Sequence, residues 1–432
     1  MCWFTNCEHN KQTAKKIISI IQKIQLSNLV REQYIINLIK KCMTNSYIFT
    51  SESVSEGHPD KVCDQISDAI LDAYLSIDKN AKVGCETFAT TNTVIVGGEV
   101  RITNGKTLPN EKIEKIIRNT IKEIGYEQDG FNWKTVKITN LIHEQSADIA
   151  IGVDVGRTEE NEGAGDQGLM FGYACDETED YMPSAIYYSH KLLKNIMDDI
   201  KNGTLKDLGP DAKAQITLKY ENGLPVKAEK VLVSIQHREH IKLENLRKIV
   251  ISYIKKTLPQ DWMPDDKNIL VNPTGRFVIG GPDGDAGLTG RKIIVDTYGG
   301  YAPHGGGAFS GKDPSKVDRS AAYVARYLAK NVVASGLAKQ CLIQISYAIG
   351  VAEPLSFYVN CNGTAVVNED LIAKKLRELV DLRPAKIVER LNLKNPIYKK
   401  TAKYGHFGRK PESDGSFSWE KLDLVEELKK LK

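Results

Sequence analysis

The sequence predicts an α+β fold of two or three domains, and three observations support this. The chain has 432 residues, more than one hydrophobic core usually supports. Apolar residues at helical and at strand spacing follow one another without strict alternation, which favours α+β over a doubly wound sheet. Three stretches share a hairpin-then-helix style, although no repeat of solenoid period is present. We therefore expect mixed sheets with helices packed on them.

The first stretch contains a strong helix. It begins after His58-Pro59-Asp60, where the apolar residues keep helical spacing. Strands are expected next at 82–90 and 93–102.

The second stretch follows an acidic, glycine-rich break at 158–168. A helix is expected at 184–201, followed by a hairpin of strands 214–220 and 226–236. Asn222-Gly223 at its turn is a strong hairpin signal.

The third stretch starts near Gly280. We expect a strand at 292–297, a glycine loop, a long helix at 314–335 and a strand at 341–350. The breaks divide the chain into an N-terminal extension (1–46), a first domain (47–149), a linker (150–162), a second domain (163–279) and a third domain (280–432).

The first 46 residues differ from the rest, since they are rich in lysine and carry isoleucine and leucine at helical spacing. A transit peptide is the alternative, but such peptides favour arginine and serine. We expect an extra amphipathic helix packed on the body of the protein, with Met43 as an alternative internal start.

Composition excludes several classes of function. A net charge of +4 and the absence of basic and aromatic stripes argue against a nucleic-acid partner. No apolar run is long enough to cross a membrane. The eight cysteines form no C-x-x-C pair, so no zinc framework is present. Scattered cysteines in a chain of this length suggest reduced thiols and a cytoplasmic protein.

Two glycine-rich segments only approximate nucleotide-binding motifs. Residues 163–168 match G-x-G-x-x-G, but acidic residues precede them and a strand-like segment follows, so we exclude a Rossmann site. Residues 306–313 approach a Walker A loop, but Asp313 stands where Ser or Thr should hold Mg²⁺. We therefore exclude a P-loop NTPase, although this loop still looks built for phosphate.

Two expected helix starts carry cations, which the helix dipole disfavours there. Asp313-Pro314 reads as an N-cap and first helical residue, with Lys312, Lys316 and Arg319 around the first turn. His58-Pro59-Asp60-Lys61 repeats the combination. A bound polyanion would offset the charge, whereas the alternative is a solvated basic helix end balanced by neighbouring aspartates.

Further basic groups alternate with carboxylates. Arg291-Lys292 follow the glycine turn 284–290, and Lys213 follows Asp211. Such a set suits a magnesium-bound polyphosphate, because carboxylate and phosphate oxygens together satisfy octahedral Mg²⁺.

Four motifs make the chain resemble the S-adenosylmethionine synthetase family. They are Ser51–Lys61, the hexapeptide Gly163–Gly168, Asn272–Phe277 and Gly305–Lys312. They occur in the family's order, and the resemblance extends from about Tyr47 to the C-terminus.

The resemblance implies a reaction that explains the charges. Methionine sulfur attacks C5′ of ATP and expels the triphosphate, which is then hydrolysed to phosphate and diphosphate. A thioether needs no deprotonation, so preorganised cations around the leaving group should dominate catalysis. The implied cofactors are Mg²⁺, two per site, and K⁺.

The resemblance also implies roles for individual residues. His58 would donate a hydrogen bond to the departing O5′, for which neutral imidazole suffices. The triphosphate clamp would comprise Lys61, Lys213, Arg291, Lys292 and Lys312. ATP would further contact Asp211, Arg276, Phe277, Asp285 and Ala308, with Phe277 stacked on adenine unless it is an ordinary strand aromatic. Methionine would contact Glu99, Gln145, Asp166, Asp285 and Lys316. The metal ligands would be Asp60 and Asp318 for Mg²⁺, and Glu86 and Ser310 for K⁺.

The family fold would consist of three α+β domains related by pseudo-threefold symmetry, whose mixed sheets pack face to face across a homodimer. Both subunits would furnish each active site, and a tetramer is the alternative assembly. Residues 145–157 correspond to the family's mobile gate, in which Ala147 replaces the usual proline and suggests a looser gate.

Two other functions stay open from the sequence. Another ATP-dependent transferase or a polyphosphate hydrolase would use the same clamp, and methionine dependence of triphosphate formation would distinguish it. A catalytically dead regulatory paralogue would lack His58, Asp60, a clamp lysine or Asp318, all of which are present.

Overall fold

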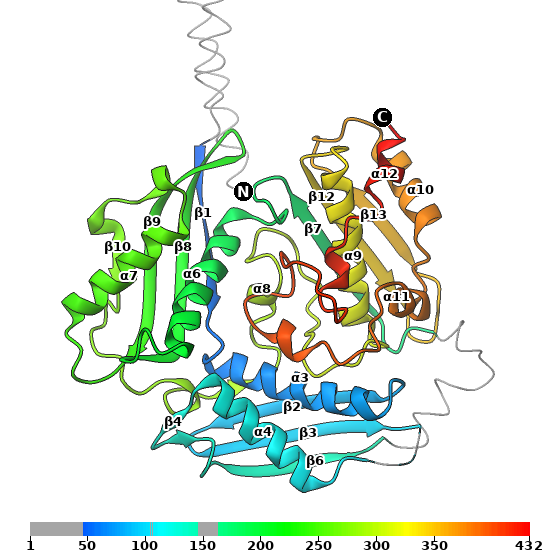
Figure 1. Cartoon of the computed structure of the whole chain (residues 1–432). Helices are drawn as coiled ribbons and strands as arrows, with labels where there is room; N and C mark the ends of the chain where they lie inside the picture. The colour runs from blue at the N-terminus through cyan, green and yellow to red at the C-terminus, as the bar shows by residue number, and fades with distance from the viewer. Residues whose placement is uncertain (1–45, 104, 106, 146–162) are drawn as a thin grey trace, which may run out of the picture. The chain divides into compact units, whose positions relative to one another are not determined.

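The computed structural model describes residues 46–103, 105, 107–145 and 163–432 (Figure 1). The expectations for the N-terminal extension, for Met43, for the linker and for the gate beyond Gln145 therefore lie outside the described residues. Contacts group the chain into two units. The described part of the first unit comprises 46–47 and 220–224, in which the rings of Tyr47 and Tyr220 stack with centroids 4.9 Å apart. The other described residues belong to the second unit.

One sheet has the strand order β11-β2-β3-β6. Its strands are β2 (Lys82–Thr90), β3 (Thr93–Arg101), β6 (Lys137–Glu144) and β11 (Gly287–Leu288). Helices α3 (Pro59–Ile77) and α4 (Asn110–Ile124) accompany it, and the sequence analysis had not assigned α4. Residues of β2 alternate, with Val83 and Cys85 buried on the side where α3 packs and Glu86 exposed on the other. A two-strand hairpin, β4 (Glu127–Gln128) and β5 (Phe131–Asn132), follows α4.

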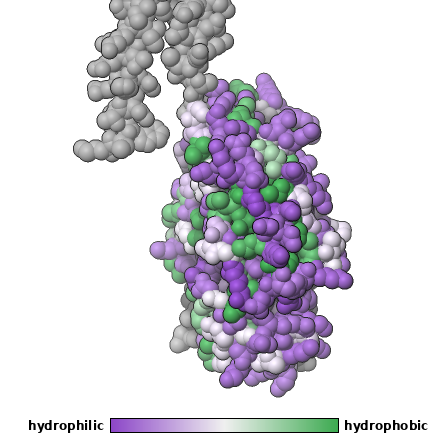
Figure 2. All heavy atoms as spheres, turned by 90° about the vertical axis from the view of Figure 1, so that its left-hand side faces the viewer, coloured by the Kyte–Doolittle hydropathy of each residue, from purple (hydrophilic) through white to green (hydrophobic). Residues whose placement is uncertain are grey.

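A second sheet has the order β1-β8-β9-β10. It contains β1 (Ser46–Val54), β8 (Leu208–Glu221), β9 (Leu224–His237) and β10 (Ile269–Val271), with helices α6 (Ser184–Lys201) and α7 (Leu243–Thr257). Asn222 and Gly223 have φ angles of 55° and 80°, as the hairpin signal predicts. Figure 2 shows the side of the molecule where α7 and β10 lie as largely hydrophilic with scattered apolar side chains, and Leu243 and Leu270 are exposed in these two elements.

The third sheet has the order β13-β12-β7 and is antiparallel throughout. Its strands are β7 (Gly168–Cys175), β12 (Gln340–Tyr347) and β13 (Ser356–Asn360). Helix α9 (Val317–Ala334) is almost entirely buried and packs on β7 and β12 (Figure 1). The other α-helices in the described part of the chain are α8 (Ile293–Asp296), α10 (Glu369–Leu379), α11 (Pro384–Arg390) and α12 (Val425–Lys429). Short 3-10 helices occur at Gln260–Trp262, Asp266–Asn268, Gly281–Asp283, Lys399–Ala402 and Ser418–Glu420.

Each of the three sheets contains one strand from a distant part of the sequence. β1 pairs with β8, β7 pairs with β12, and β11 pairs with β2. Helices and mixed sheets therefore coexist as the α+β prediction requires. The exchange matters for the site, because β11 brings the segment around Gly290 beside β2.

Most expected elements of the second unit are confirmed, with two corrections. The helix 184–201 and the strand 82–90 have the expected bounds. The expected strand 292–297 is wrong, because these β-branched residues form helix α8, in which the Asp296 N–H donates to the Lys292 carbonyl.

The second correction concerns the helix expected at 314–335, which begins only at Val317. Asp313 does not cap it. Its carboxylate instead accepts hydrogen bonds from Ser315 and from the Val83 N–H, which closes a turn before the helix.

Five of the cysteines lie in the described residues, all as buried free thiols: Cys63, Cys85, Cys175, Cys341 and Cys361. Among the described helices, none has both the length and the apolar character that a membrane span requires.

Candidate functional site

His58 caps helix α3 and faces a basic environment. Its Nδ1 accepts a hydrogen bond from the Asp60 N–H at 3.2 Å. Burial, with help from nearby Lys292 and Lys213, lowers the pKa of His58 to about 3. The ring is therefore neutral, and because Nδ1 is the acceptor, the proton resides on Nε2. A neutral imidazole with one free N–H is a hydrogen-bond donor rather than an acid.

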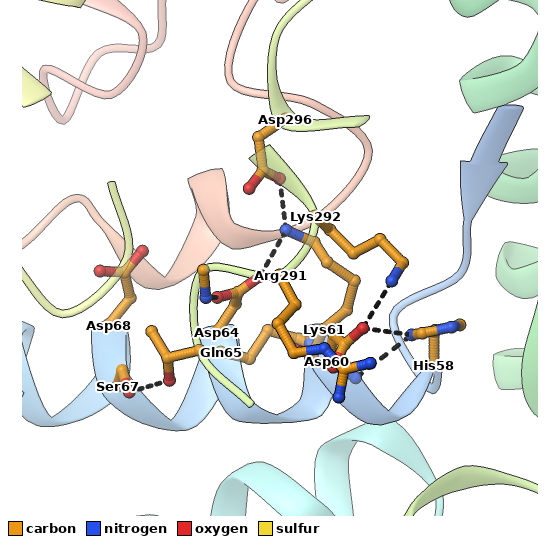
Figure 3. Close-up of polar contacts among 12 residues, drawn as sticks. His58, Asp60, Lys61, Asp64, Gln65, Ser67, Asp68, Arg291, Lys292 and Asp296 are labelled. Atoms are coloured by element: carbon orange, nitrogen blue, oxygen red, sulfur yellow. Dashed lines mark hydrogen bonds and ion pairs between the residues drawn. The ribbon is translucent and has the colours of Figure 1, made fainter. Parts of the chain in front are cut away.

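Asp60 connects the start of α3 to the segment that follows β11. Its carboxylate accepts the Leu288 N–H at 3.0 Å and the Lys292 ammonium at 2.5 Å, and Arg291 approaches it at 3.6 Å (Figure 3). Burial opposes ionisation, but these hydrogen bonds hold the pKa of Asp60 below its ordinary value. The side chain of Arg291 is 52% exposed, so its charge stays available.

Lys61, which the sequence analysis expects in the clamp, lies apart from this exposed group. Its side chain is 0% exposed, and its ammonium lies between Asp64, at 2.9 Å, and Asp296 (Figure 3). The two carboxylates outweigh the effect of burial and raise the pKa of Lys61. A lysine enclosed in this way has no exposed surface to offer a phosphate, and loss of its charge would leave two buried carboxylates without their cation.

A second charged group surrounds the loop before α9. The Lys312 ammonium pairs with Asp318, whose side chain is 21% exposed, and Lys316 pairs with Asp313 at 2.7 Å. Arg319, expected at the basic helix start, is instead wholly buried. Of the three cations expected there, only the two lysines keep access to solvent.

The residues proposed for K⁺ lie on adjacent segments. The Cys85 N–H donates to the Gly311 carbonyl, which brings Glu86 of β2 near Ser310. The hydroxyl of Ser310 is buried and has no hydrogen-bond partner among the described residues. An unpartnered buried hydroxyl on the segment next to the one that carries an exposed carboxylate fits a hard cation that prefers oxygen ligands.

The methionine-pocket residues are only partly brought together. Glu99 of β3 lies opposite Gly84 of β2, and a Cβ at Gly84 would lie 3.7 Å from Lys316 Cε and 3.9 Å from Glu99 Cγ, so these two side chains converge over Gly84. Gln145 follows β6, and its N–H donates to the Val100 carbonyl next to Glu99. Asp166 is exposed, and its carboxylate accepts the N–H of the following residue, Gln167, at 2.7 Å.

The ATP-site residues of the second and third stretches meet around Asp211. Its carboxylate accepts the Gly281 N–H at 2.7 Å, and burial raises the pKa of Asp211 to about 6. Asp285 lies in the same turn, because its N–H donates to the Gly281 carbonyl. The Phe277 carbonyl accepts the His237 N–H, and the Phe277 N–H donates to His237 Nε2. Arg276 is exposed and pairs with Glu239 at 2.6 Å.

The position of Ala308 shows that the loop with Arg291 and the loop with Lys312 lie close together. A side chain at Gly290, whose φ is 79°, would meet the Ala308 methyl at 2.6 Å. The loop that carries Arg291 and the loop that carries Lys312 therefore touch one another beside β2.

The two groups suit a magnesium-bound polyphosphate. No cluster of three or more His, Cys, Asp and Glu side chains able to hold a metal occurs in the described residues. Asp60 and Asp318 each present one carboxylate paired with a lysine. One carboxylate per ion fits Mg²⁺, which keeps several waters and takes its other oxygens from substrate phosphates.

Sequence reasoning missed Asp64 and Asp296, which hold Lys61 inside the protein. A signal for Asp64 was present, since aspartates recur every fourth residue along α3. Asp296 gave no such signal, because its partner lies in a different stretch.

Comparison with known proteins gives consistent matches. Three family models match the chain: the S-adenosylmethionine synthetase N-terminal domain at 46–147, the central domain at 161–277 and the C-terminal domain at 279–421. A protein of Parvibaculum lavamentivorans named S-adenosylmethionine synthase is 59% identical over 385 residues, which are 89% of this chain and 98% of that protein. A protein of the same name from Zymomonas mobilis is 60% identical over 391 residues, 90% of this chain and 99% of that protein.

Proposed function

The chain belongs to the S-adenosylmethionine synthetase family and makes S-adenosylmethionine from ATP and L-methionine, and we propose that the basic groups around His58 and Lys312 bind the triphosphate of ATP. The observation that carries the proposal is the environment of His58, a buried neutral imidazole beside Lys292 and Lys213. Positive charge around a hydrogen-bond donor suits a departing polyphosphate.

In the proposed reaction, a lone pair of the methionine sulfur forms a bond to C5′ of ATP. The C5′–O5′ bond breaks, and the triphosphate leaves with its electron pair. His58 donates its Nε2–H to O5′, a role that the Nδ1 contact with the Asp60 N–H supports. Lys213, Arg291, Lys292 and Lys312 stabilise the charge that develops on the leaving group. Lys61 acts on the fold instead.

In a second step, water attacks a terminal phosphorus of the bound triphosphate and yields phosphate and diphosphate. The same cations stabilise both steps, because the negative charge never leaves the site. Mg²⁺ held by Asp60 and Asp318 would neutralise phosphate oxygens. Glu86 and Ser310 would hold K⁺.

The substrate contacts follow the same proposal. Phe277 stacks on adenine, while Asp211, Arg276, Asp285 and Ala308 complete the nucleotide site. Glu99, Gln145, Asp166, Asp285 and Lys316 surround methionine, and the carboxylates of Glu99 and Asp166 balance the sulfonium charge.

We also propose the assembly and location. The domains are 47–149, 163–279 and 280–432, related by pseudo-threefold symmetry, which the strand exchange among three sheets supports. Sheets pair face to face in a homodimer with shared active sites, or in a tetramer. Glu86 and Glu99 support this, because they project from the face of β2 and β3 opposite to α3. The free thiols support a cytoplasmic location.

The decisive experiment is an incubation with ATP and methionine, read for S-adenosylmethionine, phosphate and diphosphate together. Equal amounts of the three products are expected, and chelation of Mg²⁺ should abolish them. Accumulation of free triphosphate with no phosphate would contradict the shared clamp. Triphosphate release without methionine would favour the polyphosphate-hydrolase alternative.

A further inference from the structure

Helix α3 carries an aspartate at every fourth residue: Asp60, Asp64, Asp68 and Asp72. Spacing of four brings successive side chains to neighbouring positions on a helix. Each carboxylate accepts a backbone N–H from a segment more than 200 residues further along the chain. We call these four residues the aspartate ladder.

Asp64 holds the loop that carries Arg291 and Lys292. One of its oxygens accepts the Gly290 N–H at 2.9 Å, and the other accepts Lys61 at 2.9 Å. Lys61 also binds Asp296, just beyond Lys292. Arg291 and Lys292 are therefore bracketed by two attachments to one turn of α3.

Asp68 holds the second basic loop in the same manner. Its carboxylate accepts the Gly311 N–H at 2.8 Å, directly before Lys312. The Arg319 guanidinium binds both oxygens of Asp68, at 2.8 and 2.9 Å, and donates to the Lys312 carbonyl at 3.1 Å. A bidentate, fully buried contact of this kind fixes geometry closely.

Asp72 makes the same type of contact to a segment outside the site. Its two oxygens accept the N–H groups of Tyr398 and Lys399, at 2.9 and 2.8 Å. The Lys399 ammonium binds Glu123 instead of facing the triphosphate residues. Asp72 thus provides a control within the same helix, since it accepts backbone N–H groups from a segment outside the site.

We propose that Asp64 and Asp68 are positioning residues that set the two basic loops at the correct height along α3. They act through the backbone N–H groups of Gly290 and Gly311, and their side chains contact neither substrate. The inference rests on the proposed triphosphate clamp, since it assigns a cause to the placement of Arg291, Lys292 and Lys312. Displacement of a catalytic group by about 1 Å is enough to cost roughly 100-fold in rate.

The test compares Asp64→Asn, Asp68→Asn and Asp72→Asn. Each substitution turns one amide NH₂ toward a donor that the carboxylate had satisfied. Asp64→Asn and Asp68→Asn also remove the charge that balances buried Lys61 and Arg319, whereas Asp72 bonds to backbone N–H groups, so every rate is expressed per folded enzyme. The folded fraction is measured by circular dichroism and urea unfolding. Turnover per folded enzyme is then measured for S-adenosylmethionine formation and for hydrolysis of added triphosphate.

We expect Asp64→Asn and Asp68→Asn to lower both rates by at least about tenfold. The KM for methionine should stay within about twofold of the parent value, because that pocket is built from other residues. Asp72→Asn should keep both rates within about twofold. Equal losses in all three variants, or none in the first two, would overturn the proposal.

Two further variants keep the result decisive. Lys312→Met tests the clamp directly: normal hydrolysis there would refute the clamp, whereas a loss there with normal Asp68→Asn would refute only the ladder. A second variant is used if Asp64→Asn does not fold, and this variant is Ser67→Ala. Ser67 contacts Thr289 beside Gly290 at 2.8 Å without a buried charge. Its loss should reduce hydrolysis severalfold, and unchanged hydrolysis would overturn the role of this attachment.

Discussion

The first turn of α3 and the loop before α9 both place a lysine beside aspartates, yet the two lysines have opposite surroundings. Lys61 is 0% exposed and lies between two carboxylates. Lys312 is 27% exposed and faces one carboxylate that is itself partly exposed. The comparison teaches that the number and burial of the carboxylates, and not the neighbouring sequence, decide whether a lysine is available to a substrate.

Lys61→Met should have the largest effect, and on stability. It leaves Asp64 and Asp296 buried without their cation, a loss of about 3–5 kcal/mol for a broken buried ion pair. Urea unfolding measures this. Burial already raises the pKa of Asp296 to about 7, so protonation of this group should lessen the loss in acid. If the variant kept the parent's stability but lost activity, Lys61 would belong to the triphosphate clamp, and the proposed difference between Lys61 and Lys312 would be wrong.

Lys312→Met should change activity and leave the fold intact. We expect both S-adenosylmethionine formation and triphosphate hydrolysis to fall by roughly 100-fold, the usual cost of removing one preorganised stabilising group. Its partly exposed ion pair contributes at most about 1 kcal/mol to stability. Steady-state kinetics with each substrate would check this, with Lys399→Met as a surface control. Normal hydrolysis of added triphosphate would refute the shared clamp.

The sequence predicted much of the fold because helical periodicity and the Asn-Gly turn are local signals. The helix at 184–201 and the turn at Asn222-Gly223 needed no tertiary information. The Ile-Ile-Val segment after Lys292 was misassigned as a strand, because Asp296 is held by Lys61 from another stretch. Tertiary contacts decided that segment against its β propensity.

The charged residues of the site were predictable from the sequence, but which of them are buried and which are accessible was not. Motifs identified His58, Asp60 and Lys312 as charged groups at two chain segments. Burial separates Lys61 from Lys312, and burial depends on strand β11 crossing to β2. No spacing in one stretch reveals that crossing.

His58→Asn sharpens the comparison from the substrate side. Loss of the hydrogen bond to the leaving oxygen should lower turnover by about tenfold, with little change in ATP affinity, since the lysines remain. Unchanged turnover would remove His58 from the chemistry.

The pH dependence of the parent protein provides a second check on His58. Because its folded pKa of about 3 lies below the ordinary 6.5, the neutral ring predominates at every pH above that value. Above pH 6.5 burial of the neutral ring carries no protonation cost, but between pH 6.5 and about 3 the unfolded chain binds a proton that the folded ring does not, so the free energy of unfolding decreases as pH falls through this range. The NMR signal of this ring should not titrate between pH 5 and 8, and a midpoint near 6.5 would contradict its burial among lysines.

The smallest effect is expected from replacing K⁺ with Na⁺ at fixed ionic strength. The unpartnered Ser310 hydroxyl and the exposed Glu86 carboxylate would accept either ion, but a site shaped for the larger one should hold the smaller one poorly. A severalfold decrease in turnover is therefore expected in Na⁺, and Glu86→Gln should remove the difference between the two salts. Because the pair lies beside Lys312 and away from Lys61, stability in urea should be the same in both salts. Equal rates of the parent enzyme in K⁺ and Na⁺ would withdraw Glu86 and Ser310 from the site.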